Sequence, residues 1–160
     1  WGDPTIEPAY AEHLRALAAG QPGVRLRGRY ARGGLAQVFE DIDVLVVPST
    51  WYENAPLVIQ EAFATNTPVV ATRLGGMAEA VTHGVDGLLF ERGNADDLAR
   101  QLRRLADEPG LLASLAARAP AVKTVEQEVA ELEDVYRDIA GGRPAFERSP
   151  VGHAPAGETA

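Results

Sequence analysis

The feature that most limits the fold is a strongly apolar run, Ile42-Asp-Val-Leu-Val-Val-Pro48, followed by a polar loop and a second apolar segment. Six or seven apolar or β-branched positions between turn residues predict a strand that is buried on both faces, as in a parallel sheet. Residues 49–54 are expected to form the loop at the carboxyl end of this strand, and Pro56 suits the first turn of a helix.

The helix predicted from about Pro56 to Thr65 is apolar nearly all round, which predicts that it is buried. Glu61, in its middle, is the exception. A buried carboxylate needs hydrogen-bond donors, because an unpaired buried charge is costly. A ligand rich in hydroxyls, such as a ribose or a hexose, would supply them. The alternative is a purely structural salt bridge to an arginine such as Arg73.

Strands and helices alternate along the rest of the chain, which implies a Rossmann-like α/β fold with a parallel sheet flanked by helices. Further strands are predicted at 24–28, 69–71 and 88–90, and further helices at 7–19, 35–39, 77–82, 95–106, 111–118 and 125–139. Asn94 is expected to cap the helix at 95–106, and an apolar stripe follows the helix at 125–139. Glycines and prolines among small and polar residues then predict a flexible tail at 141–160, after one domain at 1–140.

Composition excludes several classes of function. The 23 acidic against 15 basic residues give a net charge of −8, which argues against binding of nucleic acid. The absence of cysteine excludes disulfides, thiol catalysis and cysteine-ligated zinc. His13, His83 and His153 have no clustered partner, so no metal site is predicted. With no apolar stretch near the ~20 residues of a spanning helix, a cytoplasmic domain is expected.

Glu53 and Glu61, eight residues apart in Trp51-Tyr-Glu-Asn-Ala-Pro-Leu-Val-Ile-Gln-Glu61, resemble the signature of retaining GT-B glycosyltransferases of family four, the group one transferases. The pair alone would be weak, since such spacings occur by chance in many helices. The resemblance continues through the preceding strand and through three later segments, and it covers roughly residues 24–140. Those segments are Glu61-Ala-Phe-Ala-Thr-Asn-Thr-Pro-Val-Val-Ala-Thr72, Gly75-Gly-Met-Ala-Glu79 and His83-Gly-Val-Asp-Gly-Leu-Leu-Phe90.

The resemblance implies a role for each matching residue. Glu53 matches the catalytic glutamate that contacts the hydroxyls of the donor sugar, and Glu61 matches the glutamate that binds the ribose. The other residues implied in donor binding are Asn54, Ala55, Pro56, Leu57, Val58, Gly28, Arg29, Tyr30, Gly75 and Gly76. Because Pro56 lacks an N–H group, the phosphate contact at the helix start is expected from Leu57 or Val58.

Simpler structural explanations remain open for these residues. Glu53 could be a solvated loop residue, and the two glycines at 75 and 76 could form a plain turn that needs positive φ. Tyr30 and Trp51 are more often packing residues than residues that stack on a base. Two facing carboxylates, which glycosidases need, are not predicted, because Glu61 lies about two helical turns deeper than Glu53.

The family's donor-binding domain begins with strands that these 160 residues do not contain. Trp1-Gly2-Asp3 resembles the end of its second strand, and the family's sheet order is 3-2-1-4-5-6. The chain is therefore expected to be part of a longer enzyme and to be inactive alone. The unpaired edges next to Val44–Val47, a strand expected at the centre of the sheet, should favour self-association or partial unfolding.

The resemblance implies transfer of a sugar, with retention, from a nucleotide-diphosphate sugar to an acceptor glycan, lipid or small molecule. No cofactor or metal is implied. The partner would be an N-terminal acceptor domain of the same enzyme. The full-length enzyme could be peripheral to the membrane. A non-catalytic nucleotide-sugar-binding or regulatory domain remains the main alternative. A sugar epimerase of the same fold is disfavoured by the motif spacing, and a receiver-like module is disfavoured because it would need an acidic cluster after its first strand.

Overall fold

The structure, a computed structural model, describes residues 3–31 and 33–142. It contains three strands and seven helices in the described part of the chain. The strands are β1 (Leu45–Val47), β2 (Val69–Thr72) and β3 (Gly87–Phe90), and the helices are α1 (Pro8–Ala18), α2 (Leu35–Glu40), α3 (Leu57–Ala64), α4 (Gly75–Ala80), α5 (Ala95–Asp107), α6 (Leu111–Ala116) and α7 (Val125–Ala140). Every predicted helix is present, with boundaries that move by no more than two residues.

The three strands form one parallel sheet in the order β1-β2-β3. The register aligns Val46 with Val70 and Val70 with Leu88, so these three side chains form a row across the sheet. Each strand is joined to the next through a helix, α3 or α4, as parallel pairing requires. The predicted α/β class is confirmed.

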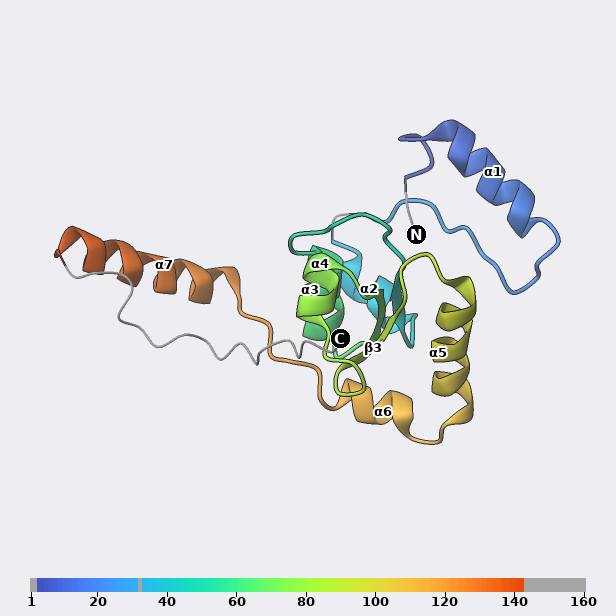
Figure 1. Ribbon diagram of the computed structural model, residues 1–160. Helices are drawn as coiled ribbons and strands as arrows, with labels where there is room; N and C mark the ends of the chain where they lie inside the picture. The colour runs from blue at the N-terminus through green and yellow to red at the C-terminus, as the bar shows by residue number, and fades with distance from the viewer. Residues whose placement is uncertain (1–2, 32, 143–160) are drawn as a thin grey trace, which may run out of the picture. The chain divides into compact units, whose positions relative to one another are not determined.

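Helices cover both faces of the sheet. Figure 1 shows α3 and α4 on one side and α5 on the other. On the α5 side, Val70, Leu88, Phe90 and Leu115 form a buried cluster. Three leucines of α5 pack against this cluster: Leu98, Leu102 and Leu105. Burial of these side chains against the sheet supplies most of the favourable energy of such a fold.

Two predictions about strands are wrong. The segment 24–28 is not a strand, and Val24 and Leu26 are 52% and 53% exposed. An extended segment becomes part of a sheet only through a neighbour's backbone, and no described strand pairs with it. It also does not pair with the 42–48 run in the described chain.

β1 is also shorter than predicted, and it lies at the edge of the described sheet. Leu45 and Val46 are only half-buried, because β1 has one neighbouring strand instead of two. The central strand is β2, in which all four residues are buried. The predicted full burial of this strand is therefore not observed in the described residues, whereas its unpaired edge is the one expected beside the missing strands, and its central place in a complete sheet stays a prediction.

α3 is buried on one side only, whereas its composition predicted burial nearly all round. Ile59, Ala62 and Phe63 face the core, but Leu57 is 73% exposed and Val58 is 36% exposed. The helix packs against the sheet with a single face, so the apolar residues at its start remain at the surface. Tyr10 and Leu17 of α1 are also exposed.

The predicted cap of α5 is present, and α7 also begins with a side-chain cap. The side chain of Asn94 accepts a hydrogen bond from the backbone N–H of Asp97 at 3.0 Å, as predicted for the start of α5. Thr124 and Gln127 form a capping box at the start of α7, a feature that the prediction did not include.

The contacts divide the chain into two compact units, residues 1–121 and 122–160. The boundary between them comes before α7, earlier than the predicted domain end at residue 140. Apart from its first two residues, the predicted tail at 141–160 lies outside the described residues. None of the helices among the described residues has the length and apolar character that a membrane crossing needs.

Candidate functional site

The predicted site residues that follow β1 and β2 gather at the carboxyl edge of the sheet. Parallel α/β sheets bind ligands at this edge, because the loops after the strands meet there. The loop after β1 carries Glu53 and Asn54, and the connection after β2 begins α4 with Gly75 and Gly76. These two connections are in direct contact, so the structure brings both groups of residues together.

Glu53 is held in a fixed place in the loop after β1. Its Oε1 atom accepts a hydrogen bond of 2.6 Å from the indole Nε1 of Trp51 and one of 3.3 Å from the hydroxyl of Ser49. Its backbone carbonyl accepts a third hydrogen bond, of 2.8 Å, from the N–H of Gly76. The side chain is half-buried. Glu53 is therefore not the freely solvated loop residue of the alternative interpretation.

Gly75 and Gly76 allow the start of α4 to lie directly on the backbone of this loop. A Cβ atom on Gly76 would be 2.2 Å from the carbonyl oxygen of Asn54, and one on Gly75 would be 3.2 Å from that of Glu53. Gly75 also has a φ of +49°, in the left-handed region that favours glycine. The two glycines thus fix the backbone of Glu53, and their predicted approach to a ligand stays a prediction.

The first turn of α3 offers two backbone donors. Pro56 occupies the N-cap, and its carbonyl accepts the N–H of Ile59 at 2.9 Å. The N–H groups of Leu57 and Val58 have no acceptor among the described residues. Free N–H groups at the positive end of a helix dipole favour anions. Ala55, in the loop just before them, is exposed.

Glu61 lies one turn further along α3, on the same side as Leu57 and Val58. Its side chain is half-buried and forms no ion pair within the described chain. The alternative salt bridge to Arg73 is therefore not observed. Glu61 is not enclosed by the core either, because α3 has one open side, so its carboxylate remains available to a ligand.

Gly28, Arg29 and Tyr30 lie in the segment between α1 and α2. Arg29 pairs with Asp3 at 3.2 Å, Gly28 has a φ of +71°, and Tyr30 is 44% exposed. A pocket of about 480 Å³ lies between this segment and α1, with Gly28 and Tyr10 in its lining, but its walls do not include Glu53 or Glu61. The role of this segment in donor binding stays a prediction.

Internal hydrogen bonds stabilise the segment around His83 that leads into β3. The Nδ1 atom of His83 accepts the N–H of Leu89 at 2.9 Å, and the carboxylate of Asp86 accepts the N–H of Thr82 at 2.8 Å. Desolvation of the imidazole, followed by the charges of Arg73 and Arg104, lowers the pKa of His83 below 6.5. The neutral ring is thus a structural acceptor at β3.

We expect the stability of the chain to fall as the pH is lowered below 6.5, in part because of His83. Its pKa is lower in the folded state, so the unfolded chain binds more protons in this window, and a protonated Nδ1 can no longer accept the Leu89 N–H. His83→Asn, which keeps an acceptor but does not titrate, should reduce this dependence in urea unfolding curves. Identical pH profiles for the two proteins would contradict the assignment.

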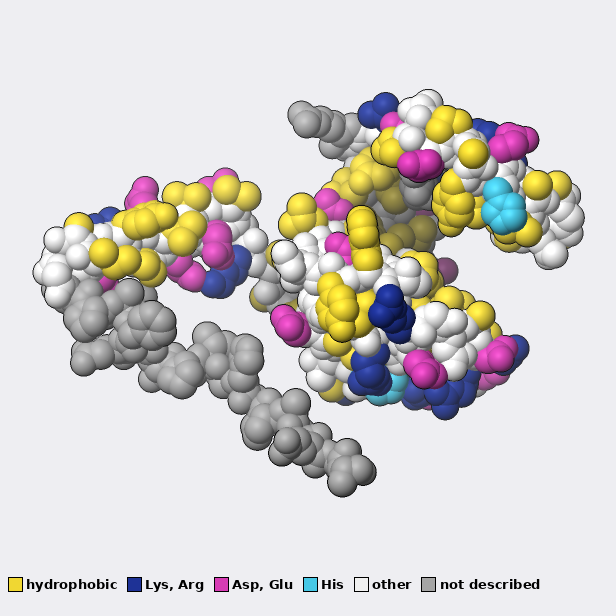
Figure 2. Space-filling view, turned by 45° about the horizontal axis from the view of Figure 1, so that its top comes forward, with side chains coloured by type: hydrophobic (Ala, Val, Ile, Leu, Met, Phe, Trp, Pro, Cys, Tyr) yellow, Lys and Arg dark blue, Asp and Glu magenta, His cyan; other side chains and the backbone are white. Residues whose placement is uncertain are grey.

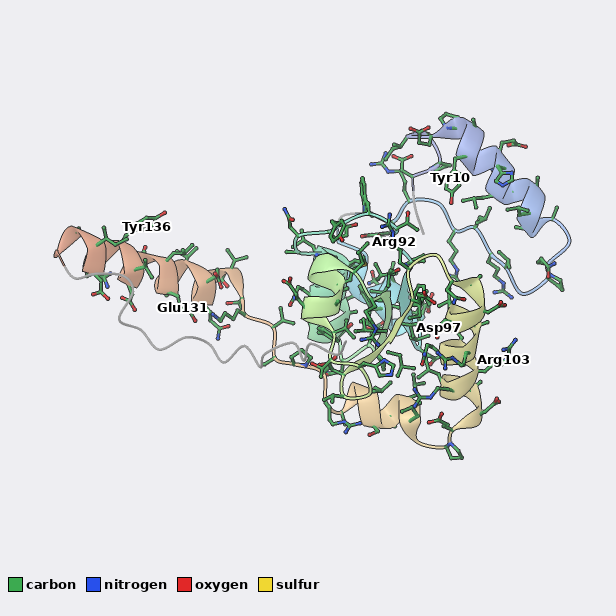
Figure 3. The ribbon with its side chains drawn as sticks, in the orientation of Figure 1. Tyr10, Arg92, Asp97, Arg103, Glu131 and Tyr136 are labelled. Atoms are coloured by element: carbon green, nitrogen blue, oxygen red, sulfur yellow. The ribbon has the colours of Figure 1, made fainter. Side chains whose placement is uncertain are left out.

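Sequence reasoning gave no role to Ser49 and treated Trp51 as a packing residue. Trp51 is 69% exposed, so its ring does not pack in the core, and its N–H group orients Glu53. The alternation of Ser49, Trp51 and Glu53 at every second position after a strand is the signal that could have indicated this support. Arg73 and Arg92 also lie at the carboxyl edge, after β2 and β3, and Figure 3 shows Arg92 in the connection to α5.

Comparison with known proteins decides the family. The family described as "Glycosyl transferases group 1" matches residues 2–108. The chain belongs to the group 1 glycosyl transferases. Among its curated relatives is the D-inositol 3-phosphate glycosyltransferase of Nocardiopsis dassonvillei, 42% identical over 123 residues. The match covers 75% of this chain but 28% of that relative, so the chain spans little more than a quarter of its length.

Solved structures of other glycosyltransferases support the same fold for this group 1 chain. Sucrose-phosphate synthase from Thermosynechococcus elongatus matches 84% of the chain with a TM-score of 0.72 and 28% identity, over 35% of its own length. Anabaena HepE in complex with UDP-glucose matches 88% of the chain with a TM-score of 0.73 and 26% identity, over 39% of its own length. The predicted GT-B relationship is confirmed.

Proposed function

We propose that this chain is the donor-binding part of a retaining glycosyltransferase of family four, which transfers a sugar from a nucleotide-diphosphate sugar to an acceptor. The observation that carries the proposal is the pair of carboxylates around the start of α3. Glu53 is oriented by Trp51 and by Ser49, whereas Glu61 has no ion pair within the described chain. The UDP-glucose bound in the HepE structure supports the ligand class.

Each group at this edge suits a different part of the donor. Glu61 would accept hydrogen bonds from the ribose hydroxyls, because a carboxylate is an acceptor only. The free N–H groups of Leu57 and Val58 would bind the phosphates at the positive end of α3. Glu53, in the loop just before the same helix, would contact the hydroxyls of the sugar on the side where the transfer takes place.

The chemistry follows from this arrangement. When the bond at the anomeric carbon breaks, negative charge develops on the leaving diphosphate. Donors that are already oriented, such as the first-turn amides of α3, stabilise that charge without rearranging. Glu53 would keep the sugar in place while the acceptor approaches, so that only the productive geometry reacts.

The acceptor and its binding domain are part of the same proposal. The chain covers 28% of the Nocardiopsis relative, so most of such an enzyme lies in other residues. We propose that an N-terminal domain of the same enzyme binds the acceptor, and that the 160 residues alone bind the donor but do not transfer its sugar. No metal or cofactor is part of the proposed mechanism.

Replacing Glu61 with glutamine should weaken nucleotide binding by about 1–3 kcal/mol, the range for a hydrogen bond to a charged group. Calorimetric titration with UDP in the enzyme that contains this chain measures the loss directly. Glu40→Gln, at the exposed end of α2, removes the same charge away from the site and should leave the affinity unchanged. Equal affinities of folded Glu61→Gln protein and wild-type protein would rule out the ribose contact.

A further inference from the structure

The carboxylate of Glu53 uses only one of its two oxygen atoms for contacts within the described chain. Oε1 accepts both hydrogen bonds, at 2.6 Å from the indole Nε1 of Trp51 and at 3.3 Å from the hydroxyl of Ser49. A carboxylate oxygen has about two lone-pair sites, so these two donors fill the capacity of Oε1. Oε2 has no donor among the described residues. The half-buried side chain therefore keeps one oxygen free for a ligand.

Contacts on both sides of the residue restrict the direction of this free oxygen. The backbone carbonyl of Glu53 accepts the N–H of Gly76 at 2.8 Å, which fixes the loop against α4. The carboxylate is held at Oε1 by Trp51, two positions earlier in the same loop. A group that is oriented before its ligand arrives loses less conformational entropy on binding, so Oε2 is prepared for a contact in one direction.

The two donors on Oε1 differ in what they permit at that position. An indole N–H group can only donate, whereas a serine hydroxyl donates or accepts and turns to suit its neighbour. Trp51 therefore requires an acceptor at the position of Oε1, and Ser49 does not. For a carboxylate the requirement has no consequence, because both oxygens accept. An amide in its place would have to turn its oxygen toward Trp51 and its NH2 group toward the ligand.

The surface at this edge carries charges of both signs. The carboxyl edge of the sheet lies at the top of Figure 1 and is turned toward the viewer in Figure 2, where acidic and basic side chains are interspersed with hydrophobic ones. On such a mixed surface, the direction of individual hydrogen bonds selects a ligand more sharply than the summed charge does.

We propose that Trp51 is a positioning residue that decides which oxygen of Glu53 meets the donor sugar, and that Oε2 accepts from a single hydroxyl group of that sugar. The indole N–H keeps Oε1 occupied, so the oxygen that faces the sugar selects a hydroxyl that donates. A sugar without this hydroxyl leaves Oε2 unpaired and is rejected. This inference rests on the proposed contact between Glu53 and the sugar, and it adds the atom that makes the contact and the group that fixes it.

The test compares Glu53→Gln with and without Trp51→Phe in the enzyme that contains this chain. In the single variant the indole N–H holds the amide oxygen, so the NH2 group faces the sugar and cannot accept. We expect kcat for transfer from UDP-glucose to fall by at least about tenfold, the scale of one hydrogen bond to a charged group. Adding Trp51→Phe frees the amide to turn, so kcat should rise again by about threefold or more, the scale of a neutral hydrogen bond. In the wild-type background the same Trp51→Phe change should lower kcat.

Glu79→Gln is the matched control, because it makes the same chemical change on an exposed side chain of α4. It should leave kcat unchanged, and Trp51→Phe should lower kcat equally with and without it. Unchanged transfer in Glu53→Ala would overturn the proposed function of Glu53 itself. Slow transfer in Glu53→Ala, together with a Glu53→Gln enzyme that Trp51→Phe does not accelerate, would overturn only the role of Trp51.

NMR of the ¹⁵N-labelled 160-residue chain checks the hydrogen bond without turnover. The chain contains two tryptophans, and the indole signal that disappears in Trp51→Phe is that of Trp51. This N–H signal should lie downfield of a free indole in the wild type, because its acceptor is charged, and it should move to the free position in Glu53→Ala. An indole signal at the same position in both proteins would contradict the contact.

Analogues of UDP-glucose that each lack one hydroxyl identify the group that contacts Oε2. With the wild-type enzyme, one analogue should lose at least about tenfold in kcat/KM, and Glu53→Gln should cause no further loss with that analogue. With the other analogues Glu53→Gln should cause its full loss. A full loss from Glu53→Gln with every analogue would overturn the contact with a single hydroxyl.

Discussion

Replacing Gly76 with alanine is expected to destabilise the chain by about 3 kcal/mol or more, in the upper range for single substitutions. The new Cβ atom would lie 2.2 Å from the carbonyl oxygen of Asn54 and 2.7 Å from that of Glu53. Both neighbours are backbone atoms, so they cannot turn aside as a flexible side chain would. α4 would have to move away from the loop, and the 2.8 Å hydrogen bond from Gly76 to Glu53 would break.

Urea denaturation followed by circular dichroism measures this loss. Gly23→Ala is the matched control, because a Cβ atom there has no neighbour within 4 Å and its φ is not in the left-handed region. Surface substitutions of this kind change stability by no more than about 0.5–1 kcal/mol. If Gly76→Ala unfolds at the same urea concentration as Gly23→Ala, the close contact between the two connections is not present in solution.

Replacing Glu53 with alanine should reduce sugar transfer by about 100-fold or more in the enzyme that contains this chain. Loss of one oriented group that acts in the transition state typically has an effect of this size. Affinity for UDP alone should change little, because Glu53 is proposed to contact the sugar and not the nucleotide. The expected result is therefore a large loss of kcat with nearly unchanged binding of UDP.

Trp51→Phe separates the positioning of Glu53 from its chemistry. The variant keeps an aromatic ring but removes the N–H group that donates to Glu53 at 2.6 Å. It should lower kcat less than Glu53→Ala does, and Glu79→Ala, an exposed glutamate on α4, should leave it unchanged. Unchanged transfer in Glu53→Ala would show that this residue has only a structural role in its loop, and the domain would then fit a non-catalytic role.

The helices were largely predictable, because their signals are local. Periodic leucines and the cap at Asn94 placed α5, and glycine and proline marked the ends of its neighbours. The three observed strands were found for the same reason, since β2 and β3 are short apolar runs between turn residues. Segment 24–28 has a similar pattern, but whether a run becomes a strand depends on a neighbour that the run itself does not specify.

The residues of the site were predictable, but the contacts that hold them in place were not. The resemblance pointed to the two glutamates and to the glycines at 75 and 76, and the structure places both connections in contact at the carboxyl edge. The contact of Gly76 with Asn54 joins residues more than twenty positions apart, and no local pattern contains that distance. The role of Trp51 was missed because an aromatic residue is more often a packing residue, and the alternation of Ser49, Trp51 and Glu53 does not by itself show that the indole donates a hydrogen bond.

Titration of the ¹⁵N-labelled 160-residue chain with UDP-glucose, followed by NMR, tests the central claim most directly. The account predicts saturable shifts of the amide signals from Glu53 to Glu61, above all those of Leu57 and Val58, whose N–H groups have no acceptor in the described chain. The signals of Gly75 and Gly76 should shift with them, and Glu61→Gln should weaken the response. Shifts confined to the pocket beside Tyr10, or no saturable shift at the start of α3, would contradict the claim that this edge binds the donor.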